Sequence, residues 1–113
     1  MRLPAGSLDR RVAILRKGEP MHDGFTKTPG AEAVFAERWA SVKPARGSEI
    51  VEFHGREGRM VMSFWLRFDE VTRTIVETDA LDFEGRRFEL VAPAMEIGRR
   101  EGIELLGVAR DVQ

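Results

Sequence analysis

One ten-residue segment constrains the fold more than any other part of the chain. Residues 59–68 read RMVMSFWLRF, and apolar side chains recur at every second position: Met60, Met62, Phe64, Leu66 and Phe68. Successive side chains of a β-strand point to opposite faces, so this alternation produces one wholly apolar face. We therefore predict a strand here that is central to the core.

Several further segments have the length and pattern of short strands. The segments 10–17 and 37–46 alternate, and Pro44 ends the second because proline donates no hydrogen bond to a sheet. The segment 71–78 is rich in β-branched residues, which favour another strand. Turn signals at 84–85 and 99–102 predict two hairpins near the C-terminus. About six short strands at regular spacing predict a mainly β fold, a small antiparallel β-barrel whose closure leaves no open edge.

The segment 47–55, GSEIVEFHG, fits a short helix or a strand. It contains an N-terminal cap, an acidic first turn and a closing glycine: Ser48, Glu49 and Gly55. Ile50 and Phe53 then meet at helical spacing, whereas a strand would place Val51 and Phe53 on one face. We prefer one short helix of one to two turns.

The long connection between the first two strands stands out. Residues 18–36 contain two prolines and two interior glycines, and they show no steady apolar period. Compact domains seldom carry so long a connection unless it has a function or is disordered. The sequence predicts a long projecting loop over 18–36, restricted by its prolines and glycines to two preferred positions.

Composition bounds the class of protein. A length of 113 residues predicts a single domain over 1–113, and 42% hydrophobic with 33% charged residues is typical of a folded chain. The net charge of −1 argues against tight DNA binding, which usually needs a clear basic excess. The chain has no cysteine, no apolar run of about 20 residues and no apolar core of a signal peptide at its start. We expect a soluble protein without a membrane segment.

Catalytic and metal-binding patterns are missing from the sequence. His22 and His54 have no ligand-type spacing, and none of the serines lies in a Gly-x-Ser-x-Gly setting. Asp79 and Asp82 are interpreted as solvating a loop between strands. We expect no enzyme activity, no metal and no cofactor.

The order of the motifs resembles a known family. The motifs are Leu8-Asp9-Arg10-Arg11, Trp39-Ala40 with Gly47-Ser48-Glu49, and Arg67-Phe68, within a similarity that runs from Gly6 to Arg110. Together they resemble the phage head–tail joining family. Its members are the head-completion or stopper proteins of long-tailed phages and gene transfer agents.

The resemblance implies a structural protein of the virion neck. Several copies, six rather than twelve, would form a homo-oligomeric ring below the portal and adaptor proteins and above the tail terminator or tail tube. The ring would retain packaged DNA and form part of the ejection channel, through which DNA passes without tight binding. Such proteins belong to the neck of a virion or phage-like particle and assemble in the cytoplasm of the bacterial host.

The resemblance also implies two sets of contact residues. The tip of the long loop would face the channel or a partner ring: Met21, His22, Asp23, Gly24, Phe25, Thr26 and Lys27. Contacts with a neighbouring subunit or the adaptor would involve Leu3, Leu8, Arg10, Arg11, Glu49 and Trp65. Glu49 would pair with an arginine across a subunit boundary or act only on its own helix dipole.

Two alternative functions stay open. The first is an adjacent neck ring such as a tail terminator or an adaptor, although adaptors of this system tend to be helical. The second is a small β-barrel that binds nucleic acid, which predicts exposed aromatic side chains on one face.

Overall fold

The structure of the chain, a computed structural model, describes residues 8–28 and 30–109. Its strands are β1 (Arg10–Lys17), β2 (Met21–His22), β3 (Lys27–Thr28), β4 (Glu32–Pro44), β5 (Met60–Arg67), β6 (Ala80–Phe83), β7 (Arg86–Leu90), β8 (Met95–Ile97) and β9 (Gly102–Ala109). The helices are α1 (Glu49–Arg56) and the short 3-10 helix η2 (Thr72–Thr74).

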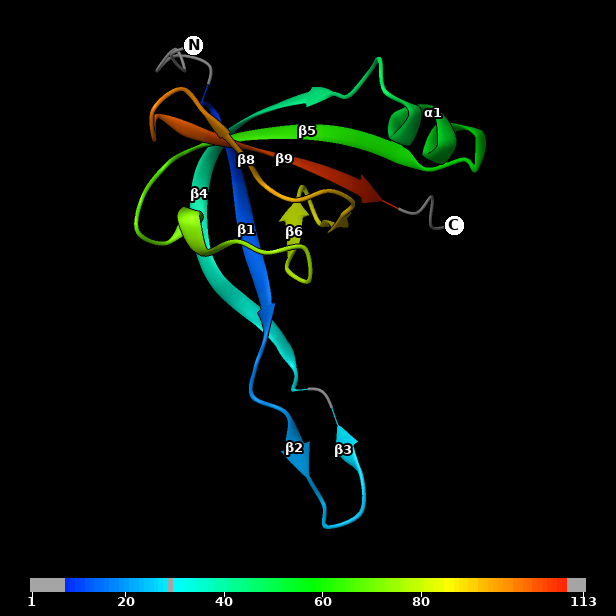
Figure 1. The fold of residues 1–113 in the computed structure, drawn as a ribbon, viewed down its shortest axis with the longest axis vertical. Coiled ribbons are helices and arrows are strands. Elements are labelled where there is room, and N and C mark those ends of the chain that lie inside the picture. Colours follow the sequence, from blue (N-terminus) through cyan, green and yellow to red (C-terminus); the bar gives the residue numbers. More distant parts are fainter. Residues whose placement is uncertain (1–7, 29, 110–113) are drawn as a thin grey trace.

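Six of the strands close into a barrel (Figure 1). They follow the order β5-β4-β1-β6-β7-β9, and β9 pairs with β5 to complete the circle. Every pairing is antiparallel, and β8 adds to β9 outside the circle. The prediction of a mainly β barrel of about six strands with one short helix is therefore confirmed.

Three phenylalanines fill the middle of the barrel. The ring of Phe64 meets Phe83 and Phe88 edge-on, with centroids 5.8 and 5.1 Å apart. These rings come from β5, β6 and β7, so one cluster joins strands that are distant in the sequence. The predicted alternation holds in the middle of β5, where Phe64 and Leu66 are fully buried. It fails at Met60, which is exposed because the pairing of β4 with β5 ends at Met62.

The strand predicted over 71–78 is wrong. This segment forms η2 and turns, because the Asp69 carboxylate accepts hydrogen bonds from the backbone N–H groups of Val71 and Thr72, both at 2.8 Å. The Thr72 hydroxyl also donates to the carbonyl of Arg67 at 2.7 Å. Side-chain bonds of this kind favour a turn over the strand that β-branched residues alone suggest.

The predicted helix forms as α1, and Ser48 caps it by accepting a hydrogen bond from the Val51 N–H at 3.1 Å. Its end lies later than predicted, since Gly55 lies inside the helix, which continues to Arg56. Gly58, with a φ of 74°, is the glycine that takes the left-handed conformation after the helix. Within residues 8–28 and 30–109, neither helix is long and apolar enough to cross a membrane.

A pair of glycines offers a direct test of the packing. A Cβ at Gly107 would lie 3.0 Å from Phe64 Cε1 and 3.1 Å from Phe88 Cβ, whereas one at Gly55 would meet open space. We predict that Gly107→Ala lowers the free energy of unfolding by about 1–3 kcal/mol through overpacking. Gly55→Ala should raise it by roughly 0.5–1 kcal/mol, because alanine favours a helix. Urea unfolding of both variants checks this, and a neutral Gly107→Ala would contradict the packing described.

Candidate functional site

The long connection is a hairpin that projects from the barrel (Figure 1). β1 and β4 stay paired as far as Lys17 and Glu32, and the Gly18 N–H donates to the Ala31 carbonyl at 3.0 Å. The strand therefore resumes at Glu32 and not at residue 37, so the loop predicted over 18–36 is too long at this end. The reason is a β-bulge, which pairs Ile14 with Ala36 but Leu15 with Val34. One extra residue shifts the side-chain alternation and hides the strand pattern.

The tip of the hairpin is a small ordered turn. Met21–His22 pairs with Lys27–Thr28, and Gly24 takes a φ of 96° between them. The Asp23 carboxylate accepts hydrogen bonds from the backbone N–H groups of Thr26 and Phe25, at 2.8 and 3.1 Å. These bonds lower the pKa of Asp23, so its carboxylate is charged at neutral pH.

All seven residues predicted for the loop tip lie in this turn or its two short strands, and all are exposed. Phe25 is 99% exposed and Met21 is 68% exposed. Two large apolar side chains thus extend into solvent at the end of the projection. That is an arrangement typical of a contact surface, because burying them would be favourable.

An ion pair fixes the base of the hairpin to the barrel. The Arg16 guanidinium donates to both oxygens of Asp79, at 3.0 and 2.8 Å, and to the carbonyl of Thr74 at 3.0 Å. The same guanidinium lies 3.8 Å from the ring centroid of Phe35. The Asp79 side chain is only 2% exposed, so the interpretation of Asp79 as a solvating loop residue is wrong. Nothing local in the sequence signals this pair, because its members lie on segments far apart.

A second ion pair joins the hairpin to β7. Arg87 donates to both carboxylate oxygens of Glu32, at 2.8 and 2.9 Å. The hydrogen bonds from Arg87 lower the pKa of Glu32. Both anchors act on the base, so any change in the direction of the hairpin is restricted to the part beyond Gly18 and Ala31. At this point of the hairpin, a Cβ on Gly30 would clash with the Gly18 carbonyl oxygen, so the two backbones lie in direct contact.

A hollow lies on the outer face of the barrel beside α1. It measures about 370 Å³, and its lining includes Lys43, Trp65, Met95 and Glu104. The Trp65 indole N–H donates to the Glu104 carboxylate at 2.9 Å, and the Ser63 hydroxyl donates to the same oxygen at 2.6 Å. Trp65 is half-buried and bonded to its own barrel, so only part of it is available for the predicted contact.

The other predicted contact residues occupy separate surfaces. Arg10 pairs with Glu84 and lies 4.9 Å from the ring centroid of Phe83. Glu49 is exposed in the first turn of α1, and Leu8 is half-buried before β1. Leu3 lies outside the described residues. The structure does not gather these residues into one site with the hairpin tip, which extends away from the barrel (Figure 1).

Trp39 is an exposed aromatic residue that the sequence analysis did not place among the candidate contact residues. It pairs with Arg11 across β1 and β4, and the Arg11 guanidinium lies 5.2 Å from its ring centroid. Trp39 is 55% exposed, which is unusual for the largest apolar side chain. Its neighbour Ala40 is fully buried, so alternation along β4 places Trp39 on the outer face, and the register with β1 adds the arginine.

The described part of the chain contains no cluster of three or more metal-ligating side chains. Its distinctive surfaces are a projection anchored at its base with an apolar tip, an exposed tryptophan with its arginine, and a helix without buried residues. These are contact features, and they define a structural or binding module.

The comparisons with known proteins agree with that class. A family model described as "phage head completion protein" matches residues 3–110, so the chain belongs to this family. Membership supports a structural role in the phage head and tail, with interactions among other head and tail proteins, and it favours a virion protein over an enzyme. No curated protein matched the chain.

One solved structure shares the fold. The solution structure of protein SF1141 from Shigella flexneri 2a superimposes with a TM-score of 0.72 at 18% sequence identity. The match covers 98% of this chain and 100% of that one. At this identity the match supports the barrel fold and says nothing further about function.

The Arg16–Asp79 ion pair predicts that the removal of two different acidic side chains, Asp79 and Glu70, has very different effects on stability. Asp79→Ala should lower the free energy of unfolding by about 3 kcal/mol, because it leaves Arg16 without its buried partner. Glu70→Ala removes a carboxylate that is 89% exposed and paired with Arg73, and should change stability by less than about 0.5 kcal/mol. Denaturant unfolding of both variants measures the difference. Equal effects would show that Asp79 does not anchor the hairpin.

The Glu32–Arg87 pair predicts an acid-sensitive hairpin base. The folded-state pKa of Glu32 is lowered from 4.5, so its stabilisation is present above pH 4.5 and is lost as the pH falls through the lower folded value. Hydrogen exchange at the Glu32 end of β4, followed from neutral to acid pH, should show this loss. In Glu32→Gln the acid-dependent part should shrink, and an unchanged profile would contradict the assignment.

Proposed function

We propose that this chain is the stopper subunit of a virion neck. Copies form a ring between the portal–adaptor assembly and the tail, retain the packaged DNA and line part of the ejection channel. The family membership supports the head–tail setting. The choice of the stopper position within the neck rests on the projecting hairpin.

The observation that carries the proposal is a projection that is anchored at its base and has an apolar end. The base of the hairpin is held by Arg16–Asp79 and Arg87–Glu32. Its tip presents Phe25 and Met21 to solvent. A loop on a rigid scaffold can place contact residues at a fixed position away from the barrel. In a ring, such tips would extend into the channel or toward an adjacent ring.

Charge supports a conduit for DNA. The chain carries 18 basic and 19 acidic side chains. Strong phosphate binding would slow the passage of DNA during ejection, whereas a surface without a basic excess would let it slide. Within the described residues, Arg16, Arg38, Arg73 and Arg87 are each paired with a carboxylate, which reduces their attraction for phosphates further.

The exposed tip predicts that function can be lost without a loss of stability. Replacing Met21 and Phe25 together by serine should leave thermal unfolding nearly unchanged, since both side chains are exposed. Particles assembled with this variant should lose packaged DNA or fail to attach tails. Val76→Ser, which alters another exposed apolar side chain at 53% exposure, is the control. Electron microscopy and nuclease protection of the particles measure both outcomes, and full activity of the double variant would contradict a role for the tip.

The nucleic-acid-binding alternative makes a different prediction. Trp39 is exposed beside Arg11, as a base-stacking surface would require. A filter-binding titration of the isolated chain with single-stranded DNA distinguishes the two functions. We expect weak binding from the stopper subunit, and tight binding that weakens steeply with salt would favour the alternative.

A further inference from the structure

The helix α1 has an apolar face that is left exposed by the described residues, 8–28 and 30–109. No residue of α1 is buried, and Ile50 and Phe53 are 41% and 49% exposed. These two side chains are neighbours on the helix surface, and Glu49 lies one turn before Phe53 on the same side. A helix of eight residues is too short to be stable on its own, so it depends on packing. We call Glu49, Ile50 and Phe53 the helix patch.

A second uncovered surface lies on β1 and β4. Val12 and Ile14 point into the core, so Arg11 and Leu15, at alternate positions, point outward. Their cross-strand partners are Trp39 and Val34, which are 55% and 59% exposed. We call Arg11, Val34 and Trp39 the strand patch.

The two patches are complementary. Each combines two large exposed apolar side chains with one charge, and the charges have opposite signs. Within the described residues, neither Glu49 nor Arg11 has a salt-bridge partner, although most other arginines of β1, β4 and β7 do. Opposite charges at the edge of an apolar contact select the partner and its orientation.

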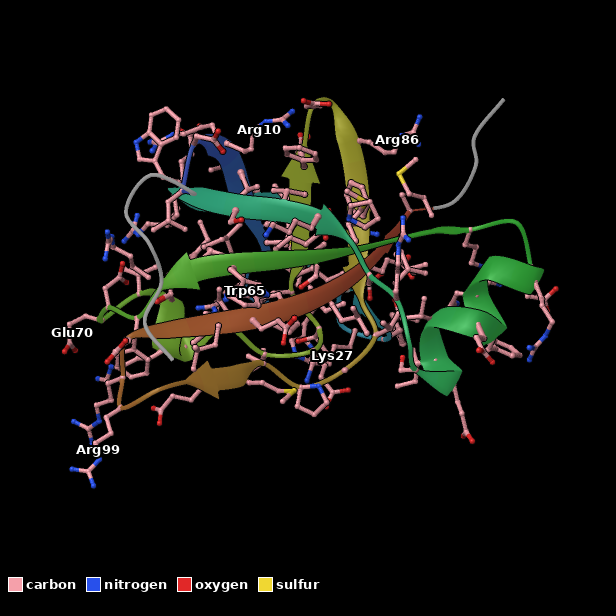
Figure 2. All side chains as sticks on the ribbon, turned by 90° about the horizontal axis from the view of Figure 1, so that it is seen from above. Arg10, Lys27, Trp65, Glu70, Arg86 and Arg99 are labelled. Atoms are coloured by element: carbon pink, nitrogen blue, oxygen red, sulfur yellow. The ribbon has the colours of Figure 1, made fainter. Side chains whose placement is uncertain are left out.

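The patches cannot meet within one molecule. In Figure 1, α1 lies at the upper right, whereas β1 and β4 run down through the middle of the molecule to the hairpin at the bottom. Figure 2 shows the separation from above, with α1 at the lower right and Arg10, at the start of β1, at the upper edge of the barrel, left of centre. A contact between them therefore requires a second copy of the chain.

We propose that the helix patch of one copy packs on the strand patch of the next, with Glu49 paired to Arg11. Two different surfaces then meet in a head-to-tail contact, and repetition of such a contact closes a ring when the rotation allows. This inference rests on the proposed ring and specifies its interface. Both patches are small compared with a stable interface of about 800 Å² per partner, so free chains should associate only weakly.

Cross-linking can detect a weak and directional contact. The chain has no cysteine, so each introduced thiol is unique. Arg56→Cys places a thiol one turn after Phe53, and Glu37→Cys places one on the outer face of β4 beside Trp39. A concentrated mixture of the two variants, treated with a short thiol-reactive cross-linker, should form a mixed dimer and few dimers of either variant alone. The matched control replaces Glu37→Cys by Val76→Cys, at an exposed position that is not part of the strand patch.

Charge reversal tests the pairing itself. Glu49→Arg in the Arg56→Cys chain should reduce the mixed dimer, because two cations would then meet. Adding Arg11→Glu to the Glu37→Cys chain should restore it, and a mere loss of helix stability in the first chain could not be repaired in this way. Circular dichroism confirms that each variant is folded.

The outcomes test the proposed interface separately from the proposed stopper function. A mixed dimer no more abundant than the Val76→Cys control, or a yield that the second reversal does not restore, overturns the interface. Dimers of Arg56→Cys alone would show a twofold contact and overturn it as well. The DNA-retention assay with the Met21 and Phe25 double variant is independent of both patches, so the stopper function can hold when this interface fails.

Discussion

The pairing of β1 with β4 is the interaction on which the rest of the structure depends. Inside the barrel it is one of six strand pairings, and outside the barrel the same two strands form the base of the hairpin. The β-bulge after Ile14 lies close to the point where the strand pairing passes from the barrel into the hairpin. Because a bulge bends and twists a strand, it lets one continuous ladder belong both to a curved barrel and to a projection.

Two ion pairs act where the ladder leaves the barrel. Beyond Leu15, which still pairs with Ala80 of β6, the described parts of β1 and β4 pair only with each other, so backbone hydrogen bonds alone would leave a marginal two-stranded ribbon. Arg16 bonds to Asp79 and Thr74, and Glu32 bonds to Arg87. These contacts supplement the strand pairing, and they connect the hairpin to the turn before β6 and to β7. The direction of the base of the hairpin is therefore set by the barrel.

Most of the fold could be predicted from the sequence, because local signals determine it. Alternation in β5, the cap at Ser48 and the turn at Glu84 and Gly85 each depend on residues close together in the chain. Three predictions failed. In two of them a nearby feature competed with the expected strand or loop, and in the third the decisive partner is distant in the sequence. At 71–78 the carboxylate of Asp69 favoured a turn over the strand, and at 32–36 the bulge broke the alternation. The partner of Asp79 lies 63 residues away, and no short-range pattern shows it.

The other exposed surfaces were harder to predict than the hairpin tip. The tip could be recognised because prolines, glycines and a polar composition interrupt the strand pattern. Trp39 could not be assigned, since alternation shows which face a side chain occupies but not whether another element covers that face. For Trp65 the outer face is partly covered, by Ser63 and Glu104 of its own barrel. Among the described residues, Arg11 lies over the ring of Trp39, which stays 55% exposed. Two tryptophans with the same strand pattern therefore differ in availability, and only the three-dimensional structure distinguishes the one that holds the barrel from the one that a neighbour can reach.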